Sequence, residues 1–350
     1  MEKIKKRENI SFLKLVLILV SAVIFFLTLG MTLGNNQNVL AATYKNAPKY
    51  KGKIKVPQNI GQTEVEGYYS VTKLKNNVYH INDYTKSPGG KKGKNPSSMY
   101  LIKGSQKALL IDTGNKVVKA RPELVGIVNT LRGNVPLAVA ITHYHEDHVG
   151  QLSAFKANTV YYPKNDQPIK NKKLRLTVNT KEHNFIWINQ GDVINLGNMQ
   201  FQVQNTPAHT PGSTTYIDKK DNLIASGDSI GSTFVFLNTG ELKKGTKHPK
   251  RAIINTYQNT LNNLYPQVKN MKNPLFMTGH RWQGIKKNTK RGDKYTPANN
   301  PMTMQYVKDM ITLTKKVKNH TATHHKYILD GKNVGTEYIY GKAEICLMTR

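Results

Sequence analysis

The chain has 350 residues, of which 38% are hydrophobic, which is enough for a sizeable core and too many for a disordered chain. Its formal net charge is +31, because 52 Lys and Arg residues face 21 Asp and Glu residues. The single cysteine, Cys346, excludes a disulfide within the chain.

This excess of positive charge concerns the surroundings of the protein rather than its fold. The lysines are dispersed along the chain and no nucleic-acid-binding motif accompanies them, so no specific nucleic-acid partner is expected. The charge instead favours solubility or electrostatic association with an anionic cell envelope.

Residues 1–41 have the pattern of a targeting segment. A basic head precedes an uncharged apolar run from Leu15 to Gly34, and small residues at Val39 and Ala41 suit cleavage after Ala41. The run is long for a signal peptide and just long enough to span a bilayer, so a cleaved signal peptide and a permanent membrane anchor both stay open. Either alternative predicts that the rest of the chain lies outside the cytoplasm, secreted or anchored.

Residues 42–66 are rich in lysine and contain prolines and glycines, which predicts a basic linker before a domain at 67–350. Alternating polarity and turn residues then predict several strands and one helix. The strands span 69–75, 77–83, 98–103, 107–112 and 136–142, and the helix spans 121–131. The strand at 136–142 is apolar throughout, as expected for burial on both faces.

The second half repeats this order of strands followed by helices. Strands are predicted at 185–188, 193–196, 199–205, 214–218 and 222–226, followed by helices at 251–268 and 302–317. Further strands at 326–330, 336–340 and 343–348 close the chain. Two β-rich halves, each followed by helices, predict an α/β fold with sheets packed together and helices outside.

The strongest chemical signal is a run of three histidines and two carboxylates at the end of the predicted strand 136–142. The run is His143-Tyr144-His145-Glu146-Asp147-His148. Neutral imidazole and carboxylate are the nitrogen and oxygen ligands that zinc prefers. In a turning segment, His143 and His145 project to one side while Asp147 and His148 face a second point nearby. One short segment is therefore able to serve two metals about 3.5–4 Å apart.

Three residues further along the chain are candidate partners of this run. His209 and Asp228 each come after a predicted strand, and His280 follows an apolar stretch at 275–277. Each stands beside a small residue that lets the backbone approach a ligand. A lone histidine is weak evidence of a metal site, but the set as a whole favours one.

The order of these motifs resembles the metallo-β-lactamase-fold superfamily. The resemblance begins at Ile111-Asp112-Thr113-Gly114, continues through the six-residue run, His209, Asp228 and His280, and covers roughly residue 69 to the C-terminus. It implies a four-layer αββα sandwich with the site at one edge of the two sheets.

Carried over residue by residue, the resemblance implies two Zn²⁺ per chain, with Fe or Mn as alternatives. The ligands of the first metal would be His143, His145 and His209. The ligands of the second would be Asp147, His148 and His280. Asp228 would bridge both metals together with a hydroxide, so Asp147 and Asp228 are the carboxylates expected at the reacting centre. Asp112 matches a supporting position beside the ligands.

The resemblance also favours one branch of the superfamily. True zinc β-lactamases lack the bridging aspartate that Asp228 matches, and di-iron flavoproteins have Glu where this chain has His145. The expected function is thus an extracytoplasmic metal-dependent hydrolase, glyoxalase II-like or lactonase-like, that uses a metal-bridging hydroxide on an ester, thioester or lactone. The alternatives are a phosphodiesterase or zinc β-lactamase with the same site, and an envelope-binding protein with vestigial catalysis.

One departure and several loops bear on the substrate. The family usually has Gly before the third histidine, where this chain has Ala208, and one methyl group there constrains the turn. Arg281 and Trp282 follow His280 directly and are candidate substrate-binding residues, which favours a small, anionic substrate. The basic loop 86–95 is a candidate cover for the site, and residues 230–249 are a candidate wall.

Overall fold

The computed structural model describes residues 54–66, 68–83, 97–116, 122–166, 181, 183–231, 234–280, 302–329 and 332–348. Residues 52–350 form one compact unit. The expected signal peptide or anchor at 1–41 and the loop at 86–95 lie outside the described residues. Within the described ranges, no helix is long and apolar enough to cross a membrane.

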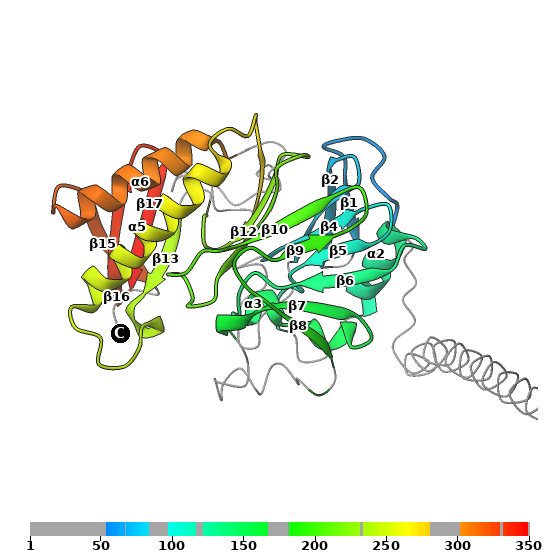
Figure 1. Ribbon diagram of the computed structural model, residues 1–350, viewed down its shortest axis with the longest axis horizontal. Coiled ribbons are helices and arrows are strands. Elements are labelled where there is room, and N and C mark those ends of the chain that lie inside the picture. Colours follow the sequence, from blue (N-terminus) through cyan, green and yellow to red (C-terminus); the bar gives the residue numbers. More distant parts are fainter. Residues whose placement is uncertain are drawn as a thin grey trace, which may run out of the picture. The chain divides into compact units, whose positions relative to one another are not determined.

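The first sheet contains eight strands that follow one another in chain order (Figure 1). They are β1 (Thr63–Glu66), β2 (Tyr69–Lys75), β3 (Val78–Asp83), β4 (Ser97–Lys103), β5 (Ala108–Ile111), β6 (Leu137–Ala140), β7 (Thr159–Pro163) and β8 (Asn184–Ile188). Neighbouring strands are antiparallel from β1 to β5 and parallel from β5 to β8. Parallel neighbours end at the same edge of a sheet, so the residues that follow β5, β6 and β7 meet there.

Short helical elements connect the parallel strands of this sheet. Helix α2 (Pro122–Arg132) lies between β5 and β6 in the chain. The one-turn helix α3 (Glu146–Val149), the 3₁₀ turn η1 (Leu152–Phe155) and the 3₁₀ turn η2 (Lys164–Asp166) follow β6 and β7. The six-residue histidine run thus forms the turn from β6 into α3, where an extended backbone changes into a helix.

The second sheet has five strands in the order β14-β12-β11-β10-β9. They are β9 (Val193–Asn195), β10 (Gln200–Asn205), β11 (Thr214–Asp218), β12 (Leu223–Gly227) and β14 (Leu275–Thr278). β12 and β14 are parallel neighbours, whereas the other pairs are antiparallel. Asp228 and His280 follow β12 and β14, so their positions at one sheet edge result from this pairing.

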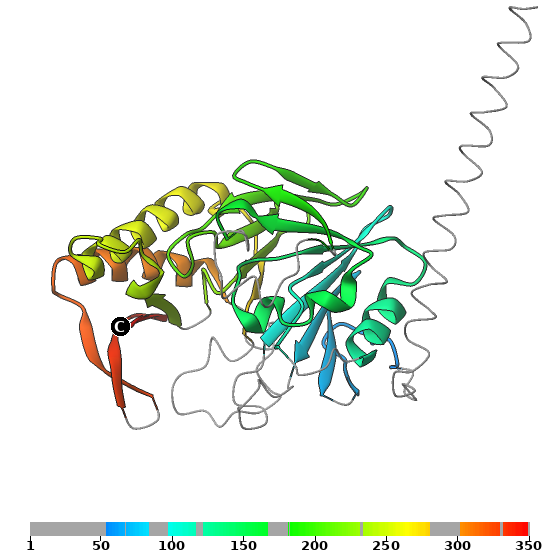
Figure 2. The same ribbon diagram turned by 90° about the horizontal axis from the view of Figure 1, so that it is seen from below.

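A third sheet of four strands is ordered β13-β17-β16-β15. The strands are β13 (Phe234–Asn238), β15 (Thr323–Leu329), β16 (Lys332–Tyr340) and β17 (Ala343–Met348), and the 3₁₀ turn η4 (Thr239–Glu241) follows β13. Helices α5 (Pro249–Val268) and α6 (Met304–Lys318) pack on each other and on this sheet (Figures 1 and 2).

Three cores separate the layers, and the alternation of side chains along the strands produces them. Leu110 of β5 packs with Leu124 of α2 on one face of the first sheet. Its neighbour Leu109 points to the opposite face and packs with Phe201 of the second sheet. The outer face of the second sheet, including Ile224, packs with α5 and α6. The order of layers is α2, first sheet, second sheet and α5 with α6, which confirms the predicted αββα sandwich.

The structure differs from the sequence analysis at several places, of which two concern the sheets as a whole. Residues 54–66, assigned there to the basic linker, belong to the folded unit, because β1 pairs with β2 and Ile54 is buried. The lysine-rich composition concealed a short edge strand with only one neighbour. The third sheet was also not predicted, although three of its strands were, because β13 lies far from them in the sequence.

The interface between the two large sheets should contribute to the stability of the fold. Phe201 is fully buried there, so Phe201→Ala should lower the free energy of unfolding by about 3–5 kcal/mol in urea denaturation. Val193 on the adjacent strand β9 is 56% exposed, and Val193→Ala should change that free energy by no more than about 0.5 kcal/mol. Equal effects of the two substitutions would contradict this packing of the sheets.

Candidate metal centre

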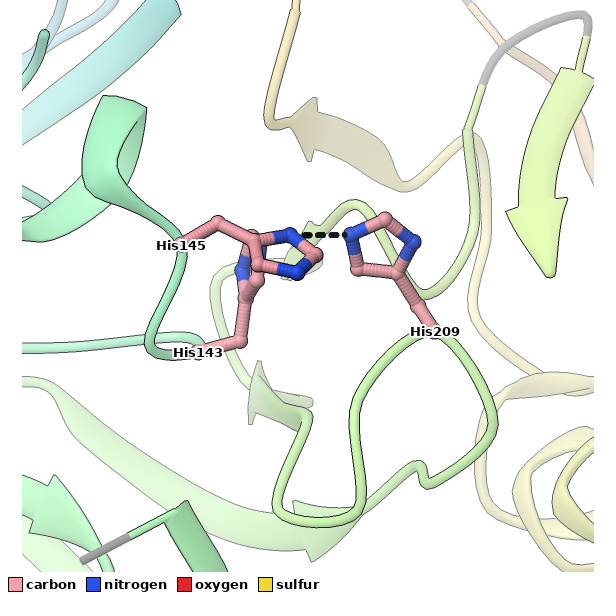
Figure 3. Close-up of side chains that lie close together, drawn as sticks. All are labelled: His143, His145 and His209. Atoms are coloured by element: carbon pink, nitrogen blue, oxygen red, sulfur yellow. Dashed lines mark hydrogen bonds between the residues drawn. The ribbon is translucent and has the colours of Figure 1, made fainter. Parts of the chain in front are cut away.

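Three histidine rings meet at one point, two from the turn after β6 and one from the turn after β10 (Figure 3). His143 Nε2 lies 3.1 Å from His145 Nδ1, and His209 Nε2 lies 2.9 Å from the same atom. Nitrogens bound about 2.0–2.1 Å from a tetrahedral zinc lie about 3.3 Å apart. The spacing of these three nitrogens therefore fits a single metal ion.

In two of these rings, the nitrogen that points away from the centre makes a hydrogen bond that determines the tautomer of the ring. Thr142 Oγ1 donates to Asp112 Oδ2, so its lone pairs accept from His143 Nδ1 at 3.0 Å. His209 Nδ1 donates to the carbonyl oxygen of Phe236 at 2.8 Å, because a carbonyl only accepts. Both rings thus carry their proton on Nδ1 and turn the lone pair of Nε2 to the centre.

A second group gathers Asp147, His148 and His280. His280 Nε2 lies 3.4 Å from Asp147 Oδ2, and His148 Nε2 lies 3.8 Å from Asp147 Oδ1. His148 Nδ1 donates to Asp112 Oδ2 at 2.8 Å, which leaves Nε2 for the centre. Asp112 therefore contacts His148 directly and His143 through the hydroxyl of Thr142.

Asp228 lies between the two groups. Its Oδ2 is 3.2 Å from His280 Nε2 and 3.5 Å from His209 Nε2, while its Oδ1 is 3.5 Å from His148 Nε2. The structure therefore brings all seven expected ligands together, with Asp228 between the two groups.

Two buried atoms in this centre show that the donor set fits a cation. His148 Nε2 and Asp228 Oδ1 are buried and have no hydrogen-bond partner among the described residues. Buried polar atoms without a partner are rare in native proteins, because burying them lowers the stability of the fold unless a hydrogen bond or a bound ion compensates. A divalent cation between an imidazole nitrogen and a carboxylate oxygen would satisfy both.

The electrostatics of the first group favour neutral imidazoles. Burial, together with the neighbouring His148, keeps the pKa of His143 well below its usual value. Burial and His145 lower the pKa of His209 to about 4. Since a metal binds the unprotonated ring, both side chains are in the binding form at neutral pH.

In the second group, nearby carboxylates favour the protonated form of the histidines. Burial lowers the pKa of His148, but the nearby Asp228 and Asp147 outweigh it and raise that pKa well above its usual value. Burial also lowers the pKa of His280, but the nearby Asp228 outweighs burial and raises that pKa above its usual value. Burial raises the pKa of Asp228, but the two histidines hold it well below its usual value. A metal must displace these protons, so binding to the second group weakens as the pH falls.

Tight backbone turns bring the ligands this close. A Cβ added at Gly279 would overlap Asp228 Oδ1 and lie 2.8 Å from His148 Cε1, so only glycine fits before His280. Ala208, where the resembling family usually has Gly, has a φ of 129°, in the region that favours glycine. The constraint expected of its methyl group is therefore a strained turn directly before His209.

Asp166 is a supporting residue that the sequence analysis did not single out. It follows β7 in η2, and its carboxylate accepts from Thr210 Oγ1 at 2.7 Å, Gly212 N at 2.6 Å and Tyr144 N at 3.1 Å. Burial raises its pKa to about 6. Asp166 thus joins the turn that carries His145 to the turn that carries His209. Because β7 itself was not predicted, nothing marked Asp166 as a strand-end residue.

Glu241 is a second residue that was not predicted. Tyr144 donates its hydroxyl to Glu241 Oε2 at 2.6 Å, and His145 Nε2 lies 3.9 Å from Glu241 Oε1. Arg281 and Trp282, the candidate substrate residues, lie outside the described residues.

Residues 93–264 match the family model of the Metallo-beta-lactamase superfamily. The chain therefore carries a metallo-beta-lactamase superfamily domain, in agreement with its layered fold and the order of its histidine and aspartate motifs.

Curated relatives include the hydroxyacylglutathione hydrolase of Bdellovibrio bacteriovorus, 31% identical over 147 residues that make up 41% of this chain and 49% of the relative. The acyl-coenzyme A thioesterase MBLAC2 of Bos taurus is 26% identical over 165 residues, 39% of this chain and 59% of the relative. The chain thus spans about half the length of these relatives. Among solved structures, the metallo-beta-lactamase FIM-1 from Pseudomonas aeruginosa has a TM-score of 0.48 and 12% identity over 72% of this chain and 97% of that chain.

The role of Asp166 is testable by removing one of its acceptor oxygens. Asp166→Asn leaves at least one buried donor facing an NH₂ group, so the free energy of unfolding should fall by about 1–3 kcal/mol. Urea denaturation of the metal-free protein measures this loss, with Asp221→Asn in a surface turn as the control. Wild-type stability of Asp166→Asn would show that the two turns do not depend on this carboxylate.

Proposed function

We propose that this protein is a metal-dependent hydrolase that cleaves an ester, thioester or lactone. The observation that carries the proposal is the position of Asp228, whose two carboxylate oxygens lie within 3.5 Å of ligand nitrogens from both groups. Such an arrangement suits two metals that share one carboxylate. We propose zinc at both positions, with iron or manganese as alternatives, because imidazole and carboxylate bind all three.

The relatives support the choice of bond. One carries the name of a hydrolase of hydroxyacylglutathione and another the name of an acyl-coenzyme A thioesterase. Both names describe an acyl group removed from a thiol-bearing carrier. A thioester is therefore the substrate class that we favour for this chain, ahead of esters and lactones.

The side chains of the centre would divide the work. When bound, two cations would polarise the substrate oxygen and lower the pKa of water toward neutrality. His143, His145 and His209 would hold the first cation, and Asp228 would fix the distance to the second. The supporting carboxylate of Asp112 would keep His148 oriented throughout turnover, because its hydrogen bond does not involve the metal-facing nitrogen.

The direct test is hydrolysis by the purified chain with and without metal. A thioester should be cleaved, a penicillin or carbapenem should not, and chelator should abolish the activity until zinc returns. Asp228→Ala should lower kcat/KM by more than about 100-fold, since loss of a mere supporting residue costs 10- to 100-fold. Asp221→Asn, which changes a carboxylate outside the centre, should leave activity unchanged.

Three results would contradict the proposal. Full activity in chelator would remove the metal from the reaction. Cleavage of bis-p-nitrophenyl phosphate without any thioesterase activity would favour the phosphodiesterase alternative, which the net charge of +31 makes reasonable. Intact zinc binding without any hydrolysis across the panel would favour an envelope-binding protein.

We further propose that the domain works outside the cytoplasm, on the basis of the apolar run Leu15 to Gly34 behind a basic head. Protease added to intact cells that express the full chain, after removal of any outer wall, should digest the domain. A mature N-terminus at Ala42 would indicate cleavage, whereas an intact N-terminus in the membrane fraction would indicate an anchor. A protected pool that is digested only after lysis would contradict export.

A further inference from the structure

A single segment, from Phe236 in β13 to Glu241 in η4, faces the outer side of two histidines of the first group. The carbonyl oxygen of Phe236 accepts from His209 Nδ1 at 2.8 Å. At the other end of the segment, Glu241 Oε1 lies 3.9 Å from His145 Nε2. The third sheet thereby reaches the metal centre through one short stretch of backbone.

His145 differs from the other two rings in what holds it. His143 is 1% exposed and His209 is 5% exposed, so packing and short hydrogen bonds fix both rings. The side chain of His145 is 31% exposed, and its Nδ1 is the atom that faces His143 and His209. If Nδ1 gives its lone pair to a metal, the proton of His145 sits on Nε2, and the carboxylate of Glu241 is the anion on that side.

The carboxylate of Glu241 is itself held in place. Tyr144, the neighbour of His145, donates to Glu241 Oε2 at 2.6 Å. The turn η4 is closed by Asn238 Oδ1, which accepts from Gly240 N at 2.9 Å, and Thr239 Oγ1 donates to the carbonyl oxygen of Met348 in β17 at 3.4 Å. Glu241 is thus fixed on one side by the third sheet and on the other by the histidine run.

We infer that Glu241 is a positioning residue for His145, which sets how tightly the first metal site binds. The ionised carboxylate favours the Nε2–H tautomer of His145 and leaves the lone pair of Nδ1 directed to the metal. The inference deepens the proposed function and rests on it, because it assumes that the three histidines hold a metal. Glu241 touches no reacting atom and acts only through the ring of His145.

Zinc affinity of the full chain, measured by competition with a chromophoric chelator, tests the inference without any assay of hydrolysis. Glu241→Ala should weaken one of the two zinc equivalents by about 10- to 100-fold and leave the other unchanged. Glu241→Gln keeps an acceptor oxygen and should weaken zinc binding less than Glu241→Ala does. Tyr144→Phe should weaken zinc binding least of the three. Glu64→Gln, on the edge strand β1 far from the centre in the sheet, is the control for loss of a carboxylate.

Activity provides a second readout, since excess zinc should restore kcat of Glu241→Gln toward that of the wild type. The inference is overturned if Glu241→Ala and Glu241→Gln bind both equivalents with wild-type affinity. It is also overturned if both equivalents weaken together with a lower Tm of the metal-free protein, which would mark Glu241 as a purely structural residue. If Glu241→Ala does not fold, Glu241→Gln decides the matter by the same criteria. A wild-type protein that binds two zinc ions but hydrolyses nothing would contradict the proposed function. The zinc affinities of the Glu241 variants would still test the role of Glu241 in that case.

Discussion

The carboxylate of Asp112 is the contact on which the metal centre depends. It accepts three donors at 2.8 Å, namely the backbone N–H and the hydroxyl of Thr142 and the Nδ1–H of His148. The contact exists because β5 and β6 are parallel neighbours and therefore end at the same edge of the first sheet. Through it, one buried anion orients a histidine in each of the two groups, so the pairing of β5 with β6 positions candidate ligands in both groups.

The sequence predicted the ligand set because each ligand obeys a local rule. His143, His209, Asp228 and His280 all follow a strand, and strand ends are where a sheet exposes side chains without losing its own hydrogen bonds. The pattern of apolar strands such as β6 and amphipathic helices such as α5 predicted sheets packed together with helices outside, and the resemblance added the four-layer αββα order. The resemblance added the roles of the ligands, and these roles stay predictions until a metal is measured.

What could not be predicted depends on partners that are distant in the chain. Glu241 lies in a polar turn with nothing in its neighbourhood to mark it, and it gains a role only because β13 packs beside the histidine turns. Asp166 was missed because β7 was not predicted, and β1 was missed because an edge strand with one neighbour needs little apolar sequence. In each case tertiary packing, rather than local pattern, assigns the residue its contacts.

The ligands come from both large sheets, and this has a consequence for the folding of the chain. His143 to His148 belong to the first sheet, whereas His209, Asp228 and His280 belong to the second, so no metal site exists until the two sheets have docked. A bound ion would then act as a cross-link that closes long loops between the halves, with the entropic benefit that such closure brings. In a chain whose single cysteine rules out an internal disulfide, a bound ion would thus add to the apolar packing that holds the two sheets together.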